Sequence, residues 1–133
     1  MTTAFQFRLD PATGVPVYRQ MIDQILVGIA TGSLPPGHQL PTVRQVAVDL
    51  AINPNTVMRA YRELEIRGVI ETQQGTGTFI ARQKSKRQDA ERERRLAQLA
   101  EDFIARGAAS GFTLPELLDE LETHRAETQK NRR

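Results

Sequence analysis

The sequence predicts a mainly α-helical protein with one small β-hairpin. Three amphipathic helical patterns precede Gly68, and only about three residues separate the second from the third. Two short β-favouring runs around a Gly-Thr-Gly turn follow directly. The chain has 133 residues, of which 39% are hydrophobic and 26% charged, so we expect a small globular domain with an appended segment rather than a large enzyme core.

The first helical pattern begins at Pro16, whose missing N–H and fixed φ suit a first turn. Apolar residues then recur at spacings of three and four, namely Tyr18, Met21, Ile22, Ile25, Leu26 and Ile29. Gly32 is the expected C-terminal cap. Residues 33–41 (SLPPGHQLP) contain three prolines and a glycine, which predicts a turn-rich connector.

The second helix is expected to start with a capping box. In it, Thr42 would accept a hydrogen bond from the N–H of Gln45, and the Gln45 side chain would reach back to the N–H of residue 42. The expected buried face consists of Val43, Val46, Ala47 and Leu50.

The third helix is predicted to have Asn53 as its N-cap and Pro54 as its first residue. At 100° per residue, the apolar side chains fall on one face, formed by Val57, Ala60, Tyr61 and Leu64. The opposite face carries Asn55, Arg59 and Arg62. Gly68 is expected to end the helix.

Residues 69–81 (VIETQQGTGTFIA) read as two short strands with a turn at Gly75, Thr76 and Gly77. Two helices, a short turn, a third helix and a hairpin follow one another in the order of a winged helix-turn-helix. We therefore assign residues 1–81 to a winged helix-turn-helix domain.

Residues 82–133 form the second predicted part, a basic linker followed by a two-helix dimerisation segment. Residues 82–95 carry seven basic side chains (Arg82, Lys84, Lys86, Arg87, Arg92, Arg94 and Arg95) against three acidic ones. Thr113 and Glu116 are expected to form a capping box. Two such helices cannot fully bury their apolar stripes alone, which predicts a homodimer. The candidate dimerisation residues are Leu96, Leu99, Ala100, Phe103, Ile104, Leu114, Leu117, Leu118 and Leu121.

Several function classes lack support. The chain has no cysteine, and His38 and His124 lie far apart without acidic ligand spacing, so we expect no metal site and no cofactor. No nucleophile triad, P-loop or catalytic carboxylate pair stands out, which argues against an enzyme. The absence of a signal-like or membrane-spanning apolar run favours a cytoplasmic protein without a membrane partner.

The polar start of the third helix indicates a role in binding double-stranded DNA. The N-terminal residues of a recognition helix reach base edges in the major groove, and its free N–H groups favour phosphate. Asn55 can pair with adenine, Arg59 can reach guanine or phosphate, and Arg62 suits a backbone contact. Thr56 offers a hydroxyl and a methyl group. Taken alone, the Asn-Pro pair is more typical of simple helix capping, and the case for DNA rests on the ordered combination of features.

Residues Val15 to Ala81 also resemble a known family, through the segments PVYRQ, GSLPPGHQLPTVRQVA, NPNTVMRAYRELE and GTGTF in order. They are similar to the DNA-binding domain of GntR-type bacterial transcription regulators, specifically the YtrA-like subfamily. The resemblance implies repression, commonly of transporter operons, and a two-helix tail that serves dimerisation. A homodimer with two symmetric recognition helices would in turn require an inverted-repeat operator. A small-molecule inducer is compatible with it, but the sequence identifies neither an inducer nor its site.

The resemblance also implies roles for single residues. Arg44 matches a DNA-contacting arginine of the family, and Met58 stands where some subfamilies carry a second one, which Arg59 would replace. The candidate DNA-binding residues are Thr42, Arg44, Asn53, Asn55, Thr56, Met58, Arg59, Arg62, Gln74, Gly75, Thr76 and Gly77.

The alternative function is a winged-helix module for protein interaction or for nonspecific, architectural binding of nucleic acid. A protein-interaction surface would favour apolar anchors on the outer side of the third helix. That side carries Asn55, Arg59 and Arg62 instead, which favours DNA.

Overall fold

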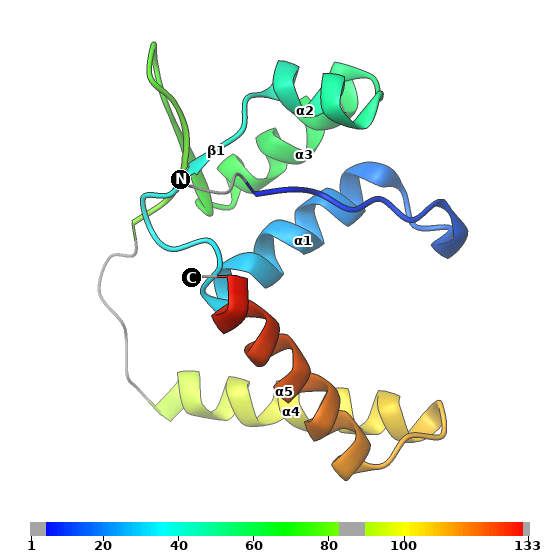
Figure 1. The fold of residues 1–133 in the computed structure, drawn as a ribbon. Helices are drawn as coiled ribbons and strands as arrows, with labels where there is room; N and C mark the ends of the chain where they lie inside the picture. Colours follow the sequence, from blue (N-terminus) through cyan, green and yellow to red (C-terminus); the bar gives the residue numbers. More distant parts are fainter. Residues whose placement is uncertain (1–4, 83–89, 132–133) are drawn as a thin grey trace. The chain divides into compact units, whose positions relative to one another are not determined.

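The computed structural model describes residues 5–82 and 90–131, with side chains up to residue 125 (Figure 1). The chain divides after Arg82 into two compact units. The first contains η1 (Pro11–Thr13), α1 (Val17–Thr31), β1 (Gln39–Leu40), α2 (Val43–Leu50), α3 (Pro54–Ile66), β2 (Ile70–Gln73) and β3 (Gly77–Ile80). The second contains α4 (Ala90–Ala109) and α5 (Leu114–Asn131). The predicted fold, mainly α-helical with a winged helix-turn-helix, is confirmed.

The three helices of the first unit begin and end close to their predicted positions. Pro16 is the N-cap of α1, one residue before the helix, and Gly32 caps its end with a left-handed φ of 90°. Thr42 Oγ1 accepts from the N–H of Gln45 at 3.0 Å. The reciprocal half of this capping box was predicted wrongly, because the Gln45 amide donates to Asp49 Oδ1 at 2.8 Å instead. This charge-assisted bond holds the Gln45 side chain toward a carboxylate one helical turn ahead, so its oxygen does not reach back to residue 42.

The sheet has three strands rather than the predicted two. Within the supposed connector, Gln39 and Leu40 form β1, which pairs antiparallel with β3 in the order β1-β3-β2. Leu40 is buried, so this short strand also contributes to the core. Two residues between prolines and glycines are too few for a periodic pattern, which explains why the sequence did not reveal the strand.

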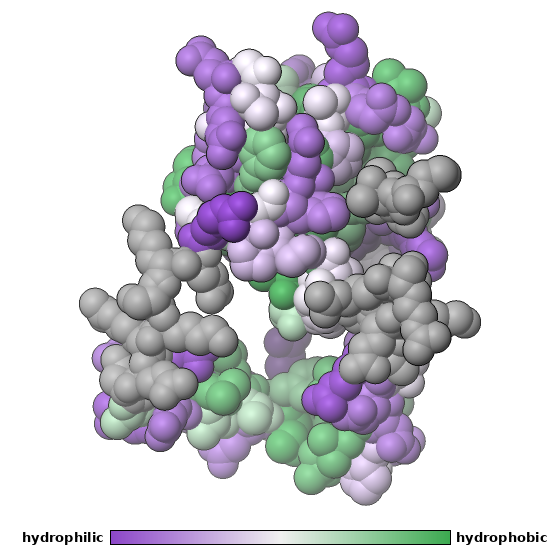
Figure 2. Space-filling model, turned by 60° about the vertical axis from the view of Figure 1, so that its left-hand side comes forward, coloured by the Kyte–Doolittle hydropathy of each residue, from purple (hydrophilic) through white to green (hydrophobic). Residues whose placement is uncertain are grey.

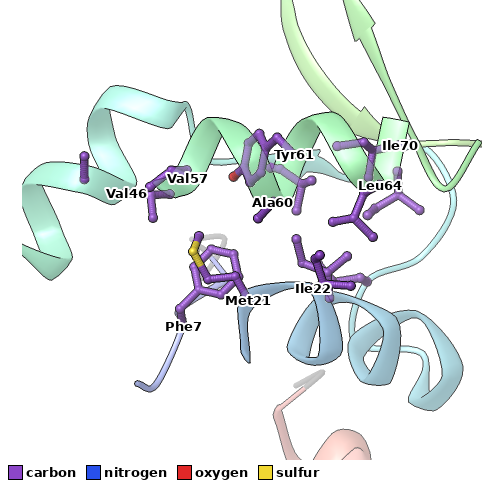
Figure 3. Close-up of a cluster of buried hydrophobic side chains, with 14 residues drawn as sticks. Phe7, Met21, Ile22, Val46, Val57, Ala60, Tyr61, Leu64 and Ile70 are labelled. Carbon is purple, nitrogen blue, oxygen red and sulfur yellow. The ribbon is translucent and has the colours of Figure 1, made fainter. Parts of the chain in front are cut away.

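The core lies between α1 and α3 and is closed by the sheet and by α2 (Figure 3). Met21 and Ile22 of α1 face Val57, Ala60 and Leu64 of α3, and all five are at most 1% exposed. The predicted buried face of α3 is therefore confirmed. Its outer face is fixed in orientation because the opposite face is fully packed.

The N-terminal segment also belongs to this core, which the sequence did not indicate. Phe7 is buried, and the Gln24 side chain binds both the N–H and the C=O of Arg8, at 2.9 and 2.7 Å. Gln20 does the same for the backbone of Asp10, at 2.8 and 3.0 Å. These two amides on α1 supply the hydrogen bonds that a neighbouring strand would otherwise provide.

The second unit consists of two helices in contact with one another. Leu117 packs so closely on Gly107 that a Cβ added at residue 107 would lie 2.7 Å from Leu117 Cδ1. The predicted capping box is present, because the N–H of Thr113 donates to Glu116 Oε1 at 2.9 Å and the N–H of Glu116 donates to Thr113 Oγ1 at 3.4 Å. Two hydrogen bonds from Thr113 lower the pKa of Glu116. The backbone N–H has the larger effect and the hydroxyl the smaller one.

The Tyr61 hydroxyl generates a stability prediction. It donates to the carbonyl of Pro41 at 2.6 Å and thereby ties α3 to the segment before α2. Tyr61→Phe should lower the free energy of unfolding by about 1–2 kcal/mol, because a partly buried carbonyl loses its partner. Urea unfolding measures this, and Tyr18→Phe is the matched control, since no described residue bonds to that hydroxyl. Equal losses in both variants would contradict the assignment.

A pH dependence follows from the same side chain. Burial raises the pKa of Tyr61 above its ordinary value of 10.0. In the unfolded chain the phenol ionises near pH 10, whereas in the folded chain it keeps its proton, so stability should fall as the pH rises above about 10. Unfolding experiments at pH 9 and 11 should show that the free energy of unfolding falls less for Tyr61→Phe than for the original protein. The same fall in both proteins would argue against this origin.

Candidate nucleic-acid interface

Four side chains share the outer face of α3. Asn55, Met58, Arg59 and Arg62 are exposed and line one shallow hollow of about 260 Å³. Their spacing of three and four residues places them above one another on the helix. The helix begins at Pro54, so its positive dipole end lies beside Asn55. The expected free N–H groups are absent there, because Pro54 has none and those of Asn55 and Thr56 both donate to Asn53, at 2.8 and 3.0 Å. The face thus combines hydrogen-bonding groups with two positive charges.

The polar cluster at the start of α3 divides into two roles. Asn53 Oδ1 accepts from the N–H of Asn55 at 2.8 Å, so this carboxamide caps the helix. The Asn55 side chain itself is exposed and has no hydrogen-bond partner among the described residues. Thr56 is half-buried. Asn55 is therefore the residue of this cluster whose carboxamide is best placed to donate and accept hydrogen bonds with a bound molecule.

Arg59 is held by an aromatic ring, which the sequence did not predict. Its guanidinium carbon lies over the Tyr18 ring of α1, 3.8 Å from the centroid. Tyr18 was predicted only as part of the buried stripe of α1, and it is indeed partly buried. A pair separated by 41 positions in sequence leaves no local periodic signal, so no pattern could have revealed this contact.

Arg44 lies at the second position of α2 and is exposed. It lines an open, mainly apolar hollow of about 470 Å³ together with Val48 and Ile52, and Pro54 contributes to the same hollow. The arginine therefore lies near the start of α3. The Thr42 oxygen is engaged in capping α2, while its hydroxyl proton is left to donate outward.

The hairpin turn consists of Gln74, Gly75 and Thr76, and the prediction that Gly77 belongs to it was wrong, since Gly77 begins β3. Gly75 has a left-handed φ of 80° and nothing within 4 Å of a built Cβ, so conformation alone requires glycine there. At Gly77 a Cβ would lie 2.6 Å from Gln39 Nε2, which donates to the Thr76 carbonyl at 3.2 Å. The missing Cβ at residue 77 thus makes room for the Gln39 carboxamide.

The basic linker can be placed only in part. Lys84, Lys86 and Arg87 lie outside the described residues. The Arg82 guanidinium lies beside Gly37, where a Cβ would approach its Nη2 to 2.7 Å. Arg92, Arg94 and Arg95 belong to the first turns of α4.

The predicted dimerisation residues form an exposed apolar surface within the second unit. Leu99 is 66% exposed and Leu118 is 52% exposed, and no residue of α4 is buried. Apolar surface is visible on this unit in Figure 2. Leu117, which packs on Gly107, is half-buried.

Other kinds of site find no support in the described part of the chain. No group of three or more His, Cys, Asp or Glu side chains there could hold a metal ion. Among the helices of residues 5–82 and 90–131, none is both long and apolar enough to cross a bilayer.

Comparisons with known proteins agree with this geometry. The profile of "Bacterial regulatory proteins, gntR family" matches residues 17–80. The uncharacterized HTH-type transcriptional regulator YhcF of Bacillus subtilis (strain 168) is 37% identical over 108 residues, which cover 81% of this chain and 88% of YhcF. The HTH-type transcriptional repressor YtrA of the same organism is 45% identical over 74 residues, or 56% of this chain and 57% of YtrA. The crystal structure of a transcriptional antiterminator from Listeria monocytogenes EGD-e matches with a TM-score of 0.70 at 27% identity, and the match covers 95% of this chain and 94% of the other.

Substitution of Asn53 should lower stability, whereas substitution of Asn55 should not. Asn53→Ala should lower the free energy of unfolding by about 1 kcal/mol, because the N–H of residue 55 loses its cap. Asn55→Ala should leave stability within about 0.5 kcal/mol of the original protein, since it is an exposed position without a protein partner. Thermal or urea unfolding measures both. A larger loss for Asn55→Ala than for Asn53→Ala would reverse the assigned roles.

Proposed function

We propose, since this chain belongs to the GntR family of bacterial regulatory proteins, that it is a cytoplasmic repressor that binds an inverted-repeat operator as a homodimer. Its named relatives are transcriptional regulators, so the chain is a regulator of transcription and not an enzyme. The observation that carries the proposal is the outer face of α3, where Asn55, Arg59 and Arg62 lie exposed at helical spacing.

Base reading is assigned to the first two turns of α3. A helix that enters the major groove by its N-terminus brings Asn55 and Arg59 to the base edges first. A carboxamide without a protein partner can pair bidentately with adenine, and a guanidinium can pair with guanine. Arg62 lies one turn further along, where the groove wall offers phosphates.

Phosphate contacts are assigned to the residues around α3. Arg44 lies near the start of α3, and the Thr42 hydroxyl can donate to a phosphate oxygen. In the wing, Gln74 and Thr76 flank Gly75 at the tip of the hairpin. From there they would contact the phosphates of a neighbouring groove. These contacts would fix the register of the protein on DNA without reading sequence.

Dimerisation is assigned to α4 and α5. Their exposed leucines are too many for a segment of this size to leave in water, and a second copy with the same stripe would cover them. Two symmetric readers require a pseudo-palindromic site with half-site centres roughly 34 Å apart. The name of the relative YtrA supports repression. Control of a transporter operon and a small-molecule inducer remain expectations from the family resemblance.

One alternative is a module for protein interaction or for nonspecific binding of nucleic acid. Binding should be compared at fixed salt for random DNA, for duplexes enriched from a random pool, and for RNA duplexes, because one structural neighbour is named as an antiterminator. A regulator should prefer the enriched DNA by about 1000-fold or more. Equal affinity for all three would overturn the proposal.

Substitutions should separate base reading from phosphate binding. Asn55→Ala should reduce the preference for one base pair in each half-site by about 1–3 kcal/mol. Arg44→Ala should weaken binding to all duplexes alike and reduce the slope of log K against log salt by about 1. Salt titrations on the enriched duplex and on its single-base variants measure both. The base-reading role is wrong if Asn55→Ala weakens every duplex equally.

Removal of the second unit should uncouple the two readers. A chain truncated at about residue 85 should fold as a monomer and bind half-sites weakly, since the effective concentration of the second reader is lost. Leu118→Glu in the full chain should shift the same equilibrium by placing a charge on the apolar surface. Sedimentation measures the mass, and a truncated chain that remains a tight dimer would refute the assignment.

A further inference from the structure

Arg59 is the arginine of α3 that an aromatic ring holds in place. Its guanidinium carbon lies over the ring of Tyr18, 3.8 Å from the centroid. Tyr18 is anchored in turn, because it lies in the first turn of α1, is partly buried, and α1 packs directly on α3. The ring is therefore a fixed platform on which a long and otherwise mobile side chain rests.

The contact leaves the hydrogen-bonding groups of Arg59 unused. No described residue accepts a hydrogen bond from this guanidinium or forms an ion pair with it. Arg67, just after the end of α3, is different, because it donates to Glu63 Oε2 at 2.7 Å. A cation over a ring face is held by the quadrupole of the ring, which requires none of the five N–H donors. Arg59 is thus oriented but still able to donate.

Orientation matters because a flexible arginine side chain loses rotamer entropy when it pairs with a base. A guanidinium that is already held loses less on binding. We propose that Tyr18 is a positioning residue for DNA recognition, which holds the Arg59 guanidinium ready to pair with a base edge. This inference rests on the proposed function, and it assigns a role in specificity to a residue of α1 that would not touch the base.

The experiment is a double-mutant cycle in the full-length protein. The duplex is enriched from a random pool, and the Arg59-dependent base pair is the one at which Arg59→Ala loses its preference. Tyr18→Leu should reduce the preference at this base pair by about threefold to fivefold, which corresponds to the loss of an exposed cation–π contact. In the Arg59→Ala background, Tyr18→Leu should change the preference no further. Tyr18→Phe keeps the ring and should retain the original preference.

A matched control separates positioning from a general loss of packing. Ile29→Ala removes another partly buried side chain of α1 and should lower stability without changing the base preference. If Tyr18→Leu weakens binding to all duplexes equally, or acts as strongly in the Arg59→Ala background, Tyr18 is only a packing residue and the proposal is overturned. The proposal would also be overturned if Tyr18→Phe reduced the base preference as much as Tyr18→Leu does. The contact with the ring face would then not be the cause of the preference.

A second measurement is independent of DNA. In the free protein, the ring current of Tyr18 should shift the side-chain proton resonances of Arg59 upfield, and Tyr18→Leu should remove that shift. If the upfield shift of Arg59 is present but the protein shows no preference among duplexes, the proposed function is overturned. The role of Tyr18 in recognition then falls with it, although the Arg59–Tyr18 contact itself stands. An absent shift, together with a preference that Tyr18→Leu does not alter, would overturn the positioning role alone.

Discussion

The packing of α3 against α1 is the interaction on which the rest of the first unit depends. Val57, Ala60 and Leu64 are wholly buried against Met21 and Ile22, so α3 can neither roll nor slide without opening the core. Tyr61 adds a directional bond to the Pro41 carbonyl, which fixes the segment leading into α2. Because one face of α3 is held in this way, the side chains of the opposite face keep a constant direction, and their polar groups can match a groove of defined shape.

The same helix pair links stability to the proposed function. α1 supplies Met21 and Ile22 to the core and, one turn earlier, the ring on which Arg59 rests. The N-terminal segment is bound to α1 through Gln20 and Gln24, so it braces the helix that carries Tyr18. The proposed dimer surface, in contrast, lies in a separate unit with its own helix contacts. Reading and assembly are thus assigned to different parts of the chain, and substitutions can test each one alone.

Local features of the sequence predicted most of this structure. Helix periodicity identified α1, α2 and α3, and capping residues placed their ends to within about one residue. The features that escaped prediction depend on contacts between distant positions. β1 is two residues long and exists because β3 lies beside it, and Gly77 is needed for the Gln39 side chain. Phe7 is buried by helices that follow it, and the Arg59–Tyr18 contact joins two helices. For the candidate site, the outward residues followed from the helical pattern, but the support of Arg59 did not.

Methylation interference on an enriched operator duplex reports, without any change to the protein, whether a symmetric pair of α3 helices binds in the major groove. Methyl groups at guanine N7 lie in the major groove, and those at adenine N3 lie in the minor groove. We expect N7 methylation to block binding in two symmetric clusters, with centres about 10 base pairs apart on one face of the duplex. Interference confined to adenine N3, or a single asymmetric cluster, would contradict a symmetric pair of α3 helices in the major groove.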